Sequence, residues 1–419
     1  MREMKDSGLV WVGRIPSNWV MHPVHFYFAE RKNKNVLGQE DNLLSLSYGR
    51  VIRKDINTNG GLLPASFNTY NIIEAGDIVI RPTDLQNDKK SLRTGLCCER
   101  GIITSAYIAL MPIRELNSAY FRYLLHAYDI SKVFYNMGNG VRQGLNFSEF
   151  GKLMVFEPPI ETQNAIVDYL DRRCAEIDSV ATDIQSQIDT LEQYKRSVIT
   201  ETVTKGLNPN AEMKDSGIEW VGRIPAHWPI HPVYSYYGER KNKNRLGKED
   251  NLLSLSYGRV IRKDINTNDG LLPENFNTYN IVEAGDIIIR PTDLQNDKRS
   301  LRTGLVKEHG IITSAYIDLC PLKQVDSRYF HFLLHAYDVM KVFYNMGNGV
   351  RQGLNYSEFS RLMVFEPPYE EQVAMADYLE TKVTEVDAII EQKKEQMAVL
   401  DAYKCSLIFE YVTGKKEVI

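Results

Sequence analysis

The sequence predicts an α+β protein with two repeated α/β domains, separated by two long helices that pair as an antiparallel coiled coil with pseudo-two-fold symmetry. Residues 4–204 recur at 213–413 with a constant offset of 209 and no gap. Each copy begins with short runs of mixed periodicity and ends with apolar residues spaced seven apart. A gapless repeat indicates equivalent structural units, and the seven-residue spacing indicates paired helices.

The two copies differ unevenly along their length. The segment LSLSYGRVIRKDINTN begins at Leu44 and again, unchanged, at Leu253. Over 31–159 about 26 of 129 positions differ between the copies, whereas over 160–204 about 28 of 45 differ. A coiled coil needs only its apolar pattern, so its other positions tolerate change. The matched polar residues of the first part indicate a shared ligand surface, a recent duplication, or both.

Short elements are expected in the first part of each copy. Apolar runs at Gly76–Arg81 and Ile102–Leu110 predict strands. The apolar spacing over Ala119–Asn136 predicts a helix. Asn146, followed by Glu149, is a candidate N-cap for another short helix.

A long helix follows the EPPI and EPPY segments. Residues spaced seven apart form the first seam: Leu170, Ile177, Ile184, Leu191 and Val198. The second helix keeps a similar seam, which Lys393 interrupts. Each helix needs an apolar partner, and its own repeat is the obvious one. The predicted divisions are globular at 1–158, helical at 159–206, globular at 207–367 and helical at 368–419.

The composition is that of an ordinary cytoplasmic globular protein. Hydrophobic residues make up 43% and charged residues 25%, with a net charge of −4. None of the five cysteines recurs in the other copy, which favours reduced thiols over a disulfide or a metal site. We expect neither a signal peptide nor a transmembrane span, because no apolar run is long enough. Local basic clusters remain compatible with DNA binding despite the net charge.

Basic and amide side chains gather at several places in the globular parts and recur in both copies. Arginine and lysine suit phosphates and guanine edges, and asparagine and glutamine suit adenine edges. Solvated loops are the simpler explanation for any one such cluster, but several matched clusters favour duplex DNA. Candidates for base contacts are Tyr48, Arg50, Gln86, Asn87, Arg142, Gln143 and Asn146 with Tyr257, Arg259, Gln295, Asn296, Arg351, Gln352 and Asn355. Further DNA-contact candidates are Arg53, Lys89, Lys90, Arg93 and Asn139 with Arg262, Lys298, Arg299, Arg302 and Asn348, and among these Lys89, Lys90 and Arg93 are expected at phosphates.

Enzymatic readings are weaker. Asp84 and Asp88 with Lys90 superficially resemble a metal-dependent nuclease pattern, but the two carboxylates are only four positions apart, which is too close for residues on two adjacent strands. EPPY at Glu366 resembles a methyltransferase loop, yet a strand-to-helix junction explains it better. Recurring histidines show no metal-ligand spacing, and no Ser/His/Asp set has motif context. We therefore expect no catalytic residue and no metal site on this chain.

Several segments in combination resemble the specificity subunits of type I restriction-modification systems. They are WVGRIPSNW and WVGRIPAHW, a globular region, then EPPIETQNAIVDYLD or EPPYEEQVAMADYLE, which opens a long helix ending at VTKGL or VTGKK. The resemblance covers essentially the whole chain, twice. It implies a subunit without an active site, whose two target-recognition domains each read half of a bipartite DNA site. It also implies that the paired helices set the spacing and dock two methyltransferase subunits, with restriction subunits as further partners where a system has them. S-adenosylmethionine, Mg²⁺ and ATP are then expected on partner subunits alone.

Two departures from the family pattern stand out. The first junction has Thr162 where the second has Glu371, so the contacts of the two helix starts are expected to differ. Family members also usually have dissimilar recognition domains, whereas here the domains are the more similar parts. We therefore expect both domains to read the same half-site, arranged as an inverted repeat. The alternatives are a DNA-modifying enzyme, either a nuclease or a methyltransferase, and a symmetric protein-interaction scaffold.

Overall fold

The chain is described from a computed structural model. The described residues are 2–56, 64, 66–83, 85, 92–135, 137, 144–265, 273, 275–292, 294, 301–344, 346 and 353–418.

Two compact units divide the chain, and each takes a segment of both long helices. The first unit joins Met1–Ile184 to Lys394–Ile419, and the second is Gln185–Lys393. Each unit therefore contains one globular domain, a segment of its own copy's helix and a segment of the other copy's helix. The four-part division predicted from the sequence follows chain order, whereas the compact units cut across both helices.

The first globular domain is built from short strands and three short helices. Its elements in chain order are β1 (Met4–Asp6), β2 (Arg14–Pro16), β3 (Val20–Pro23), α1 (Val24–Tyr27), β4 (Phe28–Glu30), β5 (Leu44–Ser47), β6 (Arg50–Arg53), β7 (Asn71–Ile73), β8 (Ile78–Ile80), β9 (Thr94–Leu96), β10 (Gly101–Ile103), β11 (Ile108–Pro112), α2 (Ser118–Ile130), α3 (Phe147–Phe150) and β12 (Met154–Glu157).

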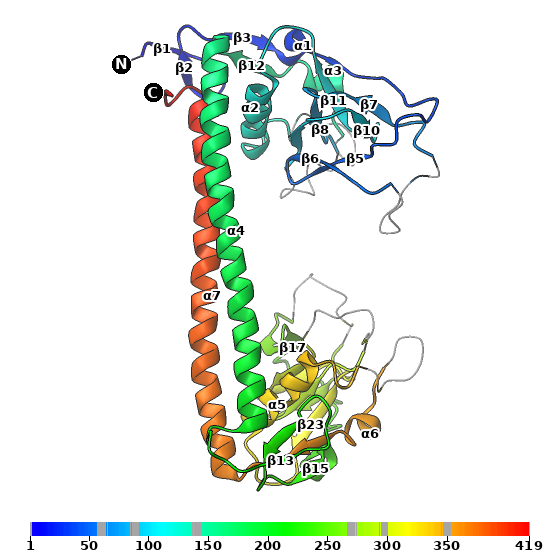
Figure 1. Ribbon diagram of the computed structural model, residues 1–419. Helices are drawn as coiled ribbons and strands as arrows, with labels where there is room; N and C mark the ends of the chain where they lie inside the picture. Colours follow the sequence, from blue (N-terminus) through cyan, green and yellow to red (C-terminus); the bar gives the residue numbers. More distant parts are fainter. Residues whose placement is uncertain are drawn as a thin grey trace. The chain divides into compact units, whose positions relative to one another are not determined.

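A four-stranded antiparallel sheet in the order β4-β11-β8-β9 lies at the centre of this domain (Figure 1). The strand pairs β1–β2, β3–β12, β5–β6 and β7–β10 surround it. Helix α2 packs against β9, and its buried Phe121, Leu124 and Tyr128 share one core with Ile78 and Leu110 of the sheet. The β3–β12 pair brings the start of the domain beside its end, where the long helix begins.

The second globular domain repeats this order element by element. Its elements are β13 (Met213–Asp215), β14 (Arg223–Pro225), β15 (Ile230–Pro232), the 3₁₀ turn η1 (Val233–Ser235), β16 (Tyr237–Glu239), β17 (Leu253–Ser256), β18 (Arg259–Arg262), β19 (Asn280–Val282), β20 (Ile287–Ile289), β21 (Thr303–Leu305), β22 (Gly310–Ile312), β23 (Ile317–Pro321), α5 (Ser327–Val339), α6 (Tyr356–Phe359) and β24 (Met363–Phe365). Its central sheet has the order β16-β23-β20-β21.

Most predicted elements of the globular part are present, with two differences. The run Ile102–Leu110 forms two strands rather than one, because a turn after Ile103 separates β10 from β11. The helix predicted over Ala119–Asn136 ends at Ile130, and the left-handed backbone of Lys132, with φ +55°, is incompatible with its continuation. The N-cap predicted at Asn146 is confirmed, since its side chain accepts a hydrogen bond from the Glu149 N–H at 3.0 Å.

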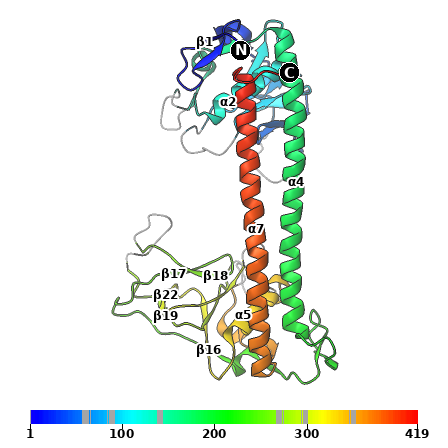
Figure 2. The same cartoon turned by 90° about the vertical axis from the view of Figure 1, so that its left-hand side faces the viewer.

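The two long helices are confirmed as α4 (Ile160–Lys205) and α7 (Tyr369–Val412). In the first unit the rings of Tyr169 and Tyr411 lie 4.4 Å apart, and Lys404 Nζ lies 2.5 Å from Asp178 Oδ1. As residue numbers increase along α4, the numbers of their partners on α7 decrease, so these segments run antiparallel, as Figure 2 shows. The predicted seam residues Leu170, Ile177 and Ile184 are buried between the segments or against the domain.

Neither long helix, nor any other helix of the described residues, is long and apolar enough to cross a membrane. Within the same residues no group of three or more His, Cys, Asp and Glu side chains is placed to hold a metal ion. The recurring His126 and His335 are half-buried, and desolvation by the surrounding protein lowers the pKa of His126 to about 4 and that of His335 to about 3. Both imidazoles are therefore neutral at pH 7.

Candidate nucleic-acid interface

An exposed β-hairpin carries the first candidate residues in each domain. Strands β5 and β6 are joined by only two residues, Tyr48 and Gly49, which have φ of +46° and +76°. Positive φ at both central residues is the signature of a type I′ turn, in which Asn-Gly is the usual pair. A tyrosine at the first position lies in a region of backbone conformation that its side chain disfavours.

The second domain repeats the turn almost without change. Tyr257 also has φ +46°, and its side chain is 86% exposed, against 87% for Tyr48. The hairpin lies close to the sheet because Gly95 of β9 has no side chain, and a Cβ there would be 2.6 Å from Leu46 Cδ1. We call Tyr48-Gly49-Arg50 and its counterpart in the second domain the hairpin tips.

The arginine of each hairpin tip reaches a carboxylate on a long helix. Arg50 lies 2.9 Å from Asp178 of α4, which also takes Lys404 of α7. The second unit has the same three-way contact, in which Asp387 of α7 takes Arg259 at 2.6 Å and Lys195 of α4 at 2.7 Å. One helix carboxylate in each unit thus joins the hairpin to both helix segments.

Sequence reasoning did not identify these helix residues. Asp178 and Lys195 recur as Asp387 and Lys404 at the 209 offset, in the part of the repeat that matches least. The sequence did contain a signal for them, because these charged residues are identical in both copies although most neighbouring helix positions differ.

The other exposed arginine of the hairpin is also paired. Arg53 Nε lies 2.9 Å from both oxygens of Glu99, and Arg262 contacts Glu308 in the same way. Hydrogen bonding to the arginine lowers the pKa of each glutamate. Arg53 and Arg262 remain exposed, so a phosphate group can reach each arginine by displacing the paired glutamate.

Arg93 and Arg302 are placed differently from the prediction. Both are 0% exposed. Arg93 Nε donates to Tyr135 Oη at 2.9 Å, and the Arg93 backbone N–H donates to Asp129 at 2.6 Å. Burial places the two arginines out of reach of a DNA backbone, so the prediction that they contact DNA is wrong. They stabilise the interior of the domains instead.

Asn146 and Asn355 act as helix N-caps. Asn355 and Glu358 form a reciprocal capping box at α6, and Asn146 caps α3. Their side-chain oxygens are thereby engaged, and a base contact from either residue stays a prediction. The remaining candidates lie outside the described residues: Gln86, Asn87, Lys89, Lys90, Asn139, Arg142, Gln143, Gln295, Asn296, Lys298, Arg299, Asn348, Arg351 and Gln352.

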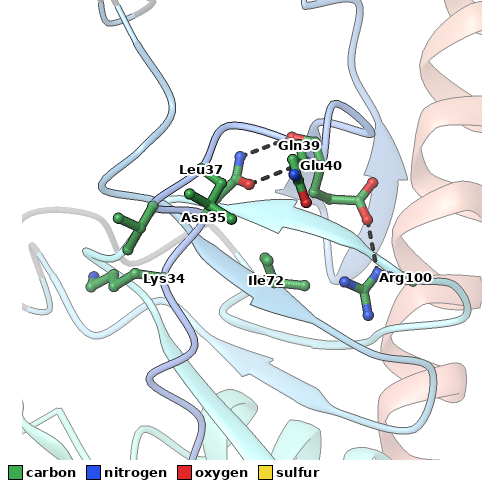
Figure 3. A pocket seen from close by; sticks show the side chains of 8 residues that line it. Lys34, Asn35, Leu37, Gln39, Glu40, Ile72 and Arg100 are labelled. Atoms are coloured by element: carbon green, nitrogen blue, oxygen red, sulfur yellow. Dashed lines mark hydrogen bonds and ion pairs between the residues drawn. The ribbon is translucent and has the colours of Figure 1, made fainter.

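A hollow of about 320 Å³ in the first domain lies over the RKNKN segment (Figure 3). Asn35 donates to Glu40 O at 2.8 Å and accepts from the Glu40 N–H at 3.2 Å. Arg100 lies between Glu40, at 2.8 Å, and Glu74, at 2.5 Å. Because these lining groups already bond one another, the hollow is explained by loop structure and does not require a ligand.

The start of each long helix is fixed by a glutamine of the shared junction. Gln163 accepts from the Asn117 N–H at 3.0 Å and donates to Pro158 O at 2.9 Å. Gln372 makes the same two contacts in the second unit. A buried glutamine therefore joins the start of each long helix to the N-cap residue of α2 in the first unit and of α5 in the second.

The neighbouring position differs between the copies, as the sequence departure predicted. Glu371 accepts from Trp228 Nε1 at 3.0 Å and lies 2.8 Å from His227 Nε2. Thr162 stands at this position in the first unit, and the buried Trp19 Nε1 has no hydrogen-bond partner among the described residues. Both Thr162 and Trp19 line an open hollow of about 580 Å³.

Replacing Thr162 by glutamate should supply the missing acceptor. We expect Thr162→Glu to raise the free energy of unfolding by about 1 kcal/mol, from one hydrogen bond and a carboxylate in the first helical turn. Chemical denaturation of the full chain measures this change. The reverse exchange, Glu371→Thr, should destabilise the second unit, whereas Glu370→Gln at an exposed position serves as the control. A neutral or destabilising Thr162→Glu would show that the Trp19 indole does not need this partner.

Comparison with known proteins finds two curated relatives. No family model matches the chain. The MjaX type I restriction enzyme specificity subunit of Methanocaldococcus jannaschii is 24% identical over 312 residues, which cover 73% of this chain and 69% of that protein. The MjaVIII specificity subunit of the same organism is 22% identical over 343 residues, covering 76% and 75%. The chain is a relative of the type I restriction enzyme specificity subunits.

A solved structure has the same fold as this chain. A chain from a structure that describes complex assembly and conformational transition of the type I R-M system superposes with a TM-score of 0.66. It is 12% identical and covers 96% of this chain and 99% of that one. The prediction of a specificity subunit rather than an enzyme agrees with the relatives, and the predicted α+β fold with two long helices is confirmed.

Proposed function

We propose that the chain is the DNA sequence-recognition subunit of a type I restriction-modification complex, and that its two globular domains read identical half-sites. The observation that carries this proposal is the recurrence of the exposed hairpin tips. Tyr48 and Tyr257 share one backbone conformation and nearly one exposure, and Arg50 and Arg259 make the same helix contact. Core packing does not demand identity at exposed tips, so a common ligand is the physical explanation that we favour.

The charge distribution supports DNA as that ligand, with the hairpins as the contacting elements. Each hairpin carries two exposed arginines in ion pairs with single carboxylates. The pairs of Arg53 with Glu99 and of Arg262 with Glu308 are exposed and contribute about 0–1 kcal/mol each, so exchanging either glutamate for a phosphate costs little. By contrast the stretch 160–196 has eight acidic against four basic residues, and its surface is an unlikely DNA contact.

The chain would bind double-stranded DNA and two methyltransferase subunits, with restriction subunits added where the system has them. S-adenosylmethionine, Mg²⁺ and ATP would bind the partner subunits, and the complex would act in the cytoplasm. The purified chain alone should then show no turnover with DNA and S-adenosylmethionine or Mg²⁺. Because the relatives are specificity subunits, the scaffold and enzyme alternatives have less support.

Mapping methylated adenines in cells that carry the system tests the half-site proposal. We expect a bipartite site whose two halves are the same short sequence in inverted orientation, separated by an unspecified gap. A site with two unrelated halves would contradict the reading of identical half-sites. A methylome that does not depend on this chain would contradict DNA recognition itself.

A further inference from the structure

The hairpin tips carry a tyrosine whose conformation the fold itself does not explain. In a type I′ turn the first central position favours asparagine or glycine, because both tolerate positive φ. Tyr48 nevertheless occupies this position at φ +46°, as Tyr257 does in the second domain. The partner position, Gly49 at φ +76°, has the residue that the turn requires.

Packing does not compensate for this conformation. Tyr48 and Tyr257 are 87% and 86% exposed, so their rings bury almost no apolar surface within the chain. An unfavourable backbone conformation that recurs at an exposed site points to a role in binding. The flat face of an exposed aromatic ring at a tip can stack on another planar group.

The other tip side chain is already held in place. Arg50 is bound to Asp178, which is itself held by Lys404 of the second helix segment. This contact fixes the hairpin relative to the helices, whereas the tyrosine ring has no hydrogen bond or ring contact with the residues that the structure describes. On the outward face of the hairpin, Ser47 lies opposite Arg50 and Ser45 opposite Ile52, so the side chains beside the ring are mostly small or polar.

We propose that Tyr48 and Tyr257 bind DNA by stacking on a base, and that Arg50 and Arg259 act as positioning residues through the helix carboxylates. This inference rests on the proposed function and specifies how the hairpin tips take part in it. Stacking needs the ring and not the hydroxyl, whereas reading a base edge needs the hydroxyl as a donor or acceptor. A narrow two-stranded ribbon also fits a DNA groove, which gives a tip residue access to the bases.

Four double variants of the full-length chain, assembled with its methyltransferase subunits, separate these roles. The probe is a duplex that carries the methylated site mapped in the host, with 2-aminopurine substituted at single positions. Tyr48→Phe/Tyr257→Phe should bind within about twofold of the wild type. Tyr48→Ala/Tyr257→Ala should lose about 5- to 150-fold in affinity per tyrosine. Quenching of 2-aminopurine should localise the stacked base in the wild type and disappear in the alanine variant.

The third variant, Tyr48→Asn/Tyr257→Asn, distinguishes a binding role from a folding role. Asparagine suits the turn better, so this variant should melt no lower than the wild type while it binds DNA as weakly as the alanine variant. Asp178→Asn/Asp387→Asn should weaken DNA binding without changing the 2-aminopurine signal of the DNA-bound complex, as expected for a contact that positions the hairpin.

Several results would overturn the inference while the proposed function stands. They are wild-type affinity in the alanine variant, a phenylalanine variant as weak as alanine, or lost methyltransferase assembly with intact DNA binding. The last outcome would identify the tips as a protein contact. If the wild-type complex does not bind the mapped duplex at all, the proposed function fails as well.

Discussion

Asp318→Ala is expected to stabilise the second unit by about 2–4 kcal/mol at pH 7.5 and to reduce its pH dependence. Asp318 lies on β23 in the interior, and neither carboxylate oxygen has a hydrogen-bond partner among the described residues. Arg240 Nε is 3.9 Å away and is already bound to Asp286 at 2.7 Å. Ala109 occupies the matching position of the first domain, so alanine fits this site of the fold.

The direction of the pH effect follows from the burial of this carboxyl group. Burial, together with the nearby Asp286, raises the pKa of Asp318 from 3.8 to about 8. The folded state therefore binds the proton more tightly than the unfolded chain does. The protonated Asp318 therefore contributes fully to the free energy of unfolding below about pH 4. This contribution is lost as the pH rises through about 8, at up to about 1.4 kcal/mol per pH unit.

Thermal denaturation between pH 5 and pH 8.5, with hydrogen exchange followed separately in each unit, measures this effect. The wild-type second unit should lose stability across the range, and the Asp318→Ala second unit should lose less. The converse variant, Ala109→Asp, should transfer the pH dependence to the first unit. Equal slopes in wild type and Asp318→Ala would contradict the raised pKa.

Arg302→Met should destabilise the second unit by about 3–5 kcal/mol, because it removes the positive charge beside a buried carboxylate. The Arg302 guanidinium donates to Tyr344 Oη at 2.9 Å, and Tyr344 Oη in turn donates to Asp338 at 2.8 Å. Methionine fills much of the volume and keeps the backbone N–H that donates to Asp338, but it leaves Tyr344 Oη and Thr292 O without the guanidinium. Arg93→Met should act in the same way on the first unit.

Urea denaturation with hydrogen exchange in each unit measures the loss. Arg259→Met is the matched control, because its exposed ion pair should contribute no more than about 1 kcal/mol. If Arg302 were a phosphate contact, Arg302→Met would keep its stability and lose DNA affinity with a smaller salt dependence. That result would reverse the assignment of Arg302 to the interior.

Local sequence signals predicted the parts of the fold that local physics determines. The seven-residue seam predicted both long helices, and the Asn146–Glu149 spacing predicted the N-cap of α3. The end of α2 was missed because Lys132 adopts a left-handed conformation that no residue preference signals. The strand over Ile102–Leu110 was missed in part because periodicity does not mark a turn between two apolar runs.

The candidate interface was harder to predict, because burial and pairing depend on residues distant in the chain. Arg93 is enclosed by Tyr135 and Asp129, 42 and 36 residues away, so its charge suggested a surface role that the fold excludes. Arg50 finds its carboxylate 128 residues away on α4. Tyr48 is exposed and its base contact stays a prediction, while its backbone conformation became known only from the structure.

The contacts at the two ends of the described chain give the topology a closed character. Lys415 donates to Val12 O and Arg14 O at 2.7 and 2.8 Å, and Arg2 lies 3.4 Å from Glu417. In the second unit, Gly206 follows α4 and lies against the ring of Trp228, as Gly414 lies against Trp19 in the first unit. The chain then continues into β13. The junction between a long helix and an entry segment is therefore built alike in the two units. A circular permutant that joins residue 2 to residue 418 and opens within 206–212 is expected to keep every described helix, strand and hairpin tip, and would exchange the order of the two globular domains along the chain.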